Sequence, residues 1–268
     1  MRLALGLQYD GTGWNGWQTQ PNKNTVQDCL EGALAQFTQR PHPTVCAGRT
    51  DAGVHAMGQV VHIDTTIDRP EWSWVRGLNA LLPSTVAVQW AQIVPDDFHA
   101  RFSARSREYI YRIFLSPVRS PLQDYFATWV YRPLDIALMQ EAAVQLLGTH
   151  DFSAFRSSEC QAPSPVRTLE VLDIVQTPCL GFAEGHQAAM LECRFKANAF
   201  LHHMVRNLMG ALVEVGRGAR PAAWITQVLA SKDRTLAAPT FAAKGLCLAK
   251  VEYDFSLPDP QLGQTAEF

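Results

Sequence analysis

The chain opens with a segment in which every second residue is apolar. This alternation over residues 2–9 predicts a half-buried strand whose inward side chains are Leu3, Leu5, Leu7 and Tyr9. A glycine-rich turn at residues 10–16 separates it from residues 26–37, where apolar residues recur at helical spacing. Asn24 followed by Gln27 resembles a capping box, so we expect the helix to begin there.

The same patterns predict the remaining elements. In the first half we expect strands over residues 43–47, 59–64 and 86–90 and one further helix over residues 71–82. In the second half we expect strands over residues 107–115, 166–176, 187–196 and 245–254 and helices over 136–147, 199–215 and 221–230. The two halves therefore share a similar strand and helix order, which predicts an α+β protein of two α/β lobes whose sheets join.

Length and composition fit two folded lobes. The chain has 268 residues, of which 47% are hydrophobic and 18% charged, the balance of a globular protein with a sizeable core. We expect an N-terminal lobe over residues 1–100, a C-terminal lobe over 101–256 and a tail over 257–268. With no apolar run of about 18 residues and no signal-peptide pattern, we expect a cytoplasmic protein that does not enter membranes.

Six cysteines lie far apart and never form a Cys-x-x-Cys pair. This spacing argues against a zinc ribbon or a redox pair and indicates reduced, mostly buried thiols.

The formal net charge of -2 argues weakly against nucleic acid as a partner. Two local stretches differ from this average: residues 99–120 hold five arginines and one acid, and residues 194–220 hold five basic residues and one acid. Each stretch alone is typical of a solvated surface. Two of them beside reactive motifs favour an anionic ligand in a groove.

The most informative motif is the loop of residues 47–55, Ala-Gly-Arg-Thr-Asp-Ala-Gly-Val-His. Its carboxylate, Asp51, stands between Gly48 and Gly53, which allow a tight backbone close to a ligand. Asp and Gly are also ordinary turn formers, so this motif alone fits a plain surface turn. The nearby Arg49 and the apolar flanks favour a reactive carboxylate.

This loop and further blocks of the sequence resemble the tRNA pseudouridine synthases of the TruA family. The resemblance runs in order from about residue 2 to 254 and is carried by residues 9–18, 25–27, 47–59, 98–104, 109–111, 148–152, 202–216, 232–234 and 245–246. It implies the pseudouridine-synthase fold, with both lobes sharing a mixed, mainly antiparallel sheet flanked by helices. It also implies a homodimer that grips tRNA and modifies uridines at about positions 38 to 40 of the anticodon arm.

The resemblance also assigns roles to residues. It implies that Asp51 is the catalytic aspartate, Tyr109 the active-site tyrosine and Arg206 its basic partner. It further implies that Arg49 attends the flipped-out nucleotide and that Leu246 contacts the base. Position 108 departs from the family pattern, since Glu108 stands where relatives are often basic, which puts one phosphate contact in doubt.

The chemistry agrees with these roles. Pseudouridine formation is an isomerisation without net redox change, so no cofactor is required. An ionised Asp51 can act as a nucleophile or as a base, and the residues alone leave both routes open. A guanidinium such as that of Arg206 within ~4 to 6 Å would lower the aspartate pKa by about 1 to 3 units.

Further side chains suit an RNA substrate. Tyr109 can stack on uracil, although tyrosines at alternating strand positions more often fill a core. His202 and Arg206 are four residues apart, so the predicted helix would place them on one face as substrate contacts. The target base must leave its stack, with arginines such as Arg101 and Arg105 holding phosphates.

Two other function classes remain open. A non-catalytic tRNA-binding protein would bind tRNA without forming product. A metal-dependent or hydrolytic enzyme would need a phosphate loop or a ligand cluster, which the sequence lacks. The adjacent His202 and His203 would point about 100° apart on a helix, so we expect no metal site.

Overall fold

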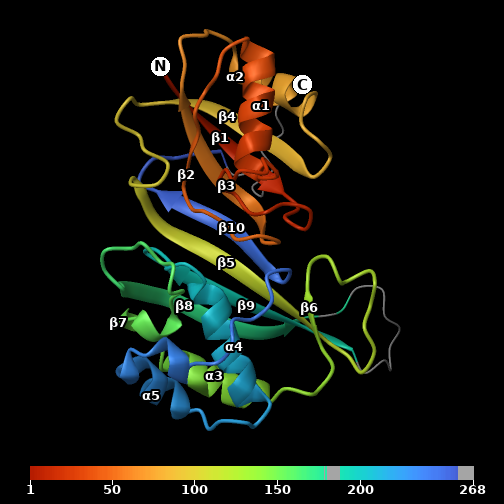
Figure 1. Cartoon of the computed structure of the whole chain (residues 1–268), viewed down its shortest axis with the longest axis vertical. Helices are drawn as coiled ribbons and strands as arrows, with labels where there is room; N and C mark the ends of the chain where they lie inside the picture. Colours follow the sequence, from red (N-terminus) through yellow and green to blue (C-terminus); the bar gives the residue numbers. More distant parts are fainter. Residues whose placement is uncertain (178, 180–187, 259–268) are drawn as a thin grey trace. The chain divides into compact units, whose positions relative to one another are not determined.

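The computed structural model describes residues 1–177, 179 and 188–258. Its strands form a large mixed sheet flanked by helices (Figure 1), which confirms the predicted fold class. The chain divides into two compact units, Met1–Arg105 with the described residues from Leu248 onward, and Ser106–Cys247. Most of the predicted tail, residues 259–268, lies outside the described residues.

The first unit has the strand order β4-β1-β3-β10. These strands are β1 (Arg2–Tyr9), β3 (His55–Asp64), β4 (Val86–Val94) and β10 (Leu246–Tyr253), the short β2 (Val45–Cys46) pairs with β3, and the helices are α1 (Val26–Thr38) and α2 (Glu71–Asn79). The central strand β1 is buried on both faces, because Trp90 of β4 packs where a Cβ on Gly6 would stand. The prediction that Leu3, Leu5, Leu7 and Tyr9 point inward was therefore correct, but the other face of the strand is largely buried as well.

The second unit has the strand order β5-β9-β8-β7. These are β5 (Ala104–Leu115), β9 (Ala189–Ala197), β8 (Val166–Thr177) and β7 (Gly148–Asp151), and β6 (Thr128–Val130) pairs with β5 in parallel. The helices are α3 (Ile136–Val144), α4 (Met204–Gly216) and α5 (Trp224–Ser231), with 3-10 turns η1 (Ser153–Phe155) and η2 (Arg234–Leu236). Helix α4 is buried along nearly its whole length and packs against α3, where Gly216 meets Met139.

Three details differ from the sequence-based expectations. Helix α4 begins at Met204 and not at residue 199, because His203 before it adopts a positive φ of 63°. Strands β6 and β7 were not predicted, since three or four residues show no periodicity. The sequence placed residues 101–256 in one lobe, whereas the compact units divide after Arg105 and group Leu248 onward with the first unit, where β10 adjoins β3.

Within the described residues, every helix is too short or too polar to cross a membrane.

Candidate active site

The loop that carries Asp51 connects β2 to β3 in the first unit. The Ala47 N–H donates to the Val60 carbonyl at 2.8 Å where the loop begins, and the Val54 N–H donates to the Asp51 carbonyl at 3.1 Å. Gly53 has a φ of 77°, a left-handed conformation that favours glycine in this turn. Asp51 itself is half-buried, and its carbonyl oxygen accepts the hydrogen bond from Val54.

The segment between β1 and α1 clamps this loop. The Trp17 N–H donates to the Thr50 carbonyl at 3.0 Å, next to Asp51 in the chain. Gly16 has a φ of 86°, and a Cβ there would lie 2.7 Å from the Thr50 carbonyl oxygen and 3.0 Å from the Asp51 carbonyl carbon. Only glycine allows the two backbones to approach this closely, so Gly16 positions the aspartate.

Three buried polar side chains also support the loop. The Tyr9 hydroxyl and the Thr50 Oγ1 are 2.8 Å apart. The Gln59 Nε2 donates to the Gly48 carbonyl at 2.6 Å and to the Tyr9 hydroxyl at 3.3 Å. These three side chains hold the backbone on both sides of Arg49, and the sequence reasoning did not identify them.

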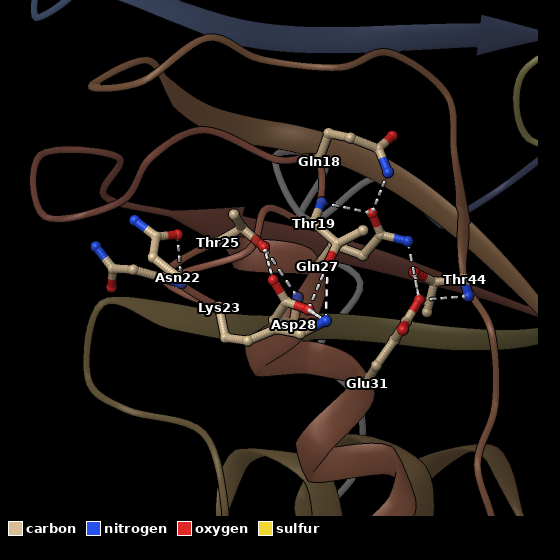
Figure 2. Close-up of polar contacts among 10 residues, drawn as sticks. Gln18, Thr19, Asn22, Lys23, Thr25, Gln27, Asp28, Glu31 and Thr44 are labelled. Atoms are coloured by element: carbon tan, nitrogen blue, oxygen red, sulfur yellow. Dashed lines mark hydrogen bonds and ion pairs between the residues drawn. The ribbon is translucent and has the colours of Figure 1, made fainter.

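Helix α1 begins at an N-cap formed by Thr25 and Asp28, which corrects the expected pair of Asn24 and Gln27 (Figure 2). The Asp28 N–H donates to the Thr25 Oγ1 at 3.2 Å, and the Thr25 hydroxyl returns a bond of 2.5 Å to Asp28 Oδ2. Although partial burial opposes its charge, hydrogen bonds from Thr25, Thr19 and Lys23 lower the pKa of Asp28. An ionised carboxylate here also suits the positive end of the helix dipole.

Gln27 and Glu31 of α1 anchor the chain ahead of the Asp51 loop (Figure 2). Gln27 Oε1 accepts from the Thr19 N–H at 3.1 Å, and its Nε2 donates to Glu31 Oε1 at 3.0 Å. Glu31 Oε1 accepts both the N–H and the hydroxyl of Thr44 at 2.9 Å. Thr44 directly precedes β2, so α1 fixes the strand that leads to Asp51.

Arg49 and Arg101 are both exposed residues of the first unit. Burial raises the pKa of the Cys46 thiol to about 12, and the positive charges of Arg49 and Arg101 oppose this rise. The charges of both guanidinium groups therefore reach the Cys46 thiol at the end of β2.

In the second unit, Tyr109 lies on β5 and is only 8% exposed. Its ring meets Phe200 edge to face at 5.1 Å. Tyr111, on the same strand, is fully buried and its hydroxyl lies 2.6 Å from Thr128 Oγ1 and donates to the Ala242 carbonyl at 2.7 Å. Tyr111 therefore has a packing role, as the sequence indicated.

Arg206 lies half-buried in the first turn of α4. Its Nε donates to the Phe241 carbonyl at 2.9 Å, and the Phe241 N–H donates back to the Arg206 carbonyl at 3.2 Å. This pair ties the side chain of Arg206 to residues 238–242.

A buried network braces the same segment. Asn207 is fully buried, and its Oδ1 accepts from Arg234 at 3.1 Å and from the Thr240 hydroxyl at 2.7 Å. Arg234 also donates to the Ala238 carbonyl at 2.8 Å, and burial lowers the pKa of its guanidinium. Arg234 thus holds residues 238–242 against α4.

The placement of His202 corrects the sequence-based expectation. His202 precedes α4, with His203 as the N-cap, so His202 and Arg206 do not share a helix face. The imidazole centroids of His202 and His203 are 4.0 Å apart, with an interplanar angle of 37°, so the two rings lie against each other and do not diverge as the helix prediction implied. Leu246 is 5% exposed at the start of β10.

Several arginines of the two basic stretches form ion pairs. Arg105 pairs with Asp254, Arg112 with Glu192 and Arg217 with Glu214. Arg194 binds Glu108 through two contacts of 2.6 and 2.8 Å. The unusual Glu108 thus has a structural partner within its own unit.

The predicted site residues divide between the two units. The first unit holds Asp51, Arg49, Arg101 and Arg105, and the second holds Tyr109, His202, Arg206 and Leu246.

Comparison with known proteins agrees with the motifs. A profile of tRNA pseudouridine synthases matches residues 7–103 and 142–254. Relatives named tRNA pseudouridine synthase A are 59% identical over 265 residues in Burkholderia multivorans and 58% identical over 266 residues in Bordetella petrii. Each match covers 98% of this chain and 94% of the relative. A protein of that name from Paraburkholderia phymatum is 58% identical over 264 residues, covering 98% of this chain and 95% of the relative. These matches confirm the resemblance, and the chain belongs to the tRNA pseudouridine synthase family.

Proposed function

We propose that this chain is an isomerase that converts uridine to pseudouridine in tRNA, with Asp51 as its catalytic carboxylate. The observation that supports this most is the fixed backbone at Asp51. Gly16 closely approaches the backbone of Thr50 and Asp51, the hydrogen bonds of Tyr9, Thr50 and Gln59 hold the loop at Gly48 and Thr50, and Asp51 is only half-buried. Such a preorganised acid suits a reaction that needs one charged group at a defined position.

The reaction requires no added atoms. The bond between N1 and C1′ breaks, the uracil turns, and a bond forms between C5 and C1′. C5 then loses its proton and N1 gains one. An ionised Asp51 acts either as the nucleophile at C1′ or as a base on the sugar. Both routes need the carboxylate charged, and neither needs a redox cofactor.

We assign the remaining roles from the family motifs. Arg206 supplies the positive charge that favours ionised Asp51, and Tyr109 stacks on the uracil. His202 and Leu246 contact the substrate. The interactions of Arg206 with Phe241 are consistent with this role, because they fix its side chain.

We further propose that the substrate is the anticodon arm of tRNA, at about positions 38 to 40, and that the protein works as a homodimer in the cytoplasm. The target nucleotide leaves its stack, Arg49 steadies the vacated position, and Arg101 and Arg105 contact phosphates. The ion pair of Arg105 with Asp254 weakens its attraction for a phosphate, so Arg101 is the stronger candidate.

The test is the release of tritium from tRNA that carries 5-tritiated uridine. Asp51→Asn keeps the side-chain shape but removes the charge, so we expect turnover to vanish while tRNA binding and the unfolding midpoint remain close to wild type. Asp68→Asn, an exposed acid of the same unit, is the matched control. Near-wild-type release by Asp51→Asn would reject the mechanism, and wild-type protein that binds tRNA without product would favour a non-catalytic binding protein.

A further inference from the structure

Phe102 is the most exposed aromatic side chain among the described residues, at 75%. Single exposed apolar side chains are common on proteins and need no special explanation. Phe102 differs because its ring packs against the ring of His99.

The ring of Phe102 rests on a column of two histidines. Its centroid lies 4.4 Å from that of His99 with an interplanar angle of 31°, and His99 meets the buried His62 at 4.9 Å. The guanidinium of Arg101 lies 5.4 Å from the centroid of Phe102. An aromatic ring and a cation are thus presented together at the surface.

Backbone hydrogen bonds make the loop of residues 99–103 rigid. The N–H groups of Arg101 and Phe102 both donate to His99 Nδ1 at 3.2 Å. The His99 N–H donates to the Ser103 Oγ at 2.9 Å, and the Ser103 N–H returns a bond of 2.9 Å to the His99 carbonyl. The Ala100 N–H donates to His62 Nδ1 at 3.1 Å.

Both histidines are uncharged at neutral pH. Each uses Nδ1 as an acceptor, and burial lowers the pKa of His62 to about 4 and that of His99 below its usual value. Neutral rings do not repel the guanidinium of Arg101, and they offer a stacking surface that does not change above pH 7.

The column stands beside the strand that enters the Asp51 loop. His62 of β3 pairs with Val45 of β2, and the next residue, Cys46, is acted on by the charges of both Arg49 and Arg101. The surface around Phe102 therefore adjoins the loop that carries the proposed catalytic carboxylate, within one compact unit.

We propose that Phe102 and Arg101 form a stacking site for an unpaired nucleobase of the RNA substrate, with the guanidinium meeting the adjoining phosphate. This inference rests on the proposed function. Aromatic rings next to arginine bind splayed nucleotides, because every base has a stacking face and every linkage a negative charge. A rigid ring suits this role, since little conformational freedom is lost when the base binds.

The experiment compares Phe102→Ala, Phe102→Trp and the control Trp72→Ala, which removes another aromatic side chain of this unit, 63% exposed on α2. Loss of a stacked base should weaken tRNA binding at least about fivefold in Phe102→Ala. Phe102→Trp should stay within about twofold of wild type, because stacking tolerates either ring, and Trp72→Ala should do the same because Trp72 lies outside the proposed stacking site. Unfolding midpoints should be unchanged in all three, since both side chains are exposed.

The outcomes separate the two proposals. If Phe102→Ala binds and turns over tRNA like wild type while Asp51→Asn is inactive, the stacking site is rejected and the proposed function stands. If Phe102→Ala changes the molecular mass measured by light scattering, the surface is a contact between copies of the chain, and the stacking site is again rejected. Wild-type protein without tRNA binding or product would overturn both.

Discussion

Replacing Gly16 by alanine should disable the Asp51 loop while the protein remains folded. Gly16 has a φ of 86°, and holding a non-glycine residue in that region costs of order 1–3 kcal/mol. The added Cβ would also lie 2.7 Å from the Thr50 carbonyl oxygen and 3.1 Å from the Ala52 nitrogen, so the loop has to move by several tenths of an ångström. A displacement of about 1 Å at a reacting group can cost about 10²-fold in rate.

The assay pairs tritium release with urea denaturation. We expect Gly16→Ala to lose about 1–3 kcal/mol of unfolding free energy and tenfold to a hundredfold of turnover, roughly. The matched control is Gly13→Ala in the same turn, where a Cβ meets nothing within 4 Å and φ is not positive, so both quantities should stay near wild type. Wild-type turnover in Gly16→Ala would refute the idea that this glycine positions Asp51.

Two further predictions concern Arg234 and His62. Arg234→Gln should lower the unfolding free energy by about 1–3 kcal/mol in urea denaturation, because Asn207, Thr240 and the Ala238 carbonyl lose a hydrogen-bond donor. Tritium release should also fall, because residues 238–242, which hold Arg206, become less well fixed. Unchanged turnover would show that Arg234 does not support Arg206. Folded His62 resists protonation down to about pH 4, whereas an unfolded histidine titrates near pH 6.5, so the unfolded chain binds more protons in between. Unfolding free energy should therefore fall by about 1–2 kcal/mol as pH is lowered from 6.5 to 4, after allowance for solvent screening, and His62→Gln should flatten this dependence in denaturant titrations at several pH values.

Hydrophobic periodicity predicts the long elements because their apolar side chains recur at the spacing of a strand or a helix. Strand β1 and helix α1 lie where the apolar patterns place them. The predicted start of α4 was wrong because apolar residues continue before Met204. The helix is interrupted there by the positive φ of His203, which the pattern of apolar residues does not reveal. Strand β6 is three residues long and forms only by pairing with β5, a contact between distant segments.

The site shows the same division. Asp51 is marked in the sequence by its flanking glycines and by the family motif. Tyr9 and Gln59, which support it, lie 50 residues apart in the chain and meet only when β1 pairs with β3. The N-cap was placed one residue early, because both Asn24 and Thr25 are good capping residues and only the hydrogen bond from the Asp28 N–H to the Thr25 hydroxyl oxygen distinguishes them.

The arginine-rich stretches show why counting charges overstates the attraction for RNA. Arg105, Arg112, Arg194 and Arg217 each pair with an acid of their own unit, and Glu108 serves one of these pairs. Such pairs neutralise part of the local positive charge, and the whole chain has a formal net charge of -2. Long-range attraction is therefore a weak source of specificity in this protein. Recognition of a nucleotide has to depend more on shape, on stacking surfaces and on the fixed position of the carboxylate, because these contacts act only at close range and only on a base that has left its stack.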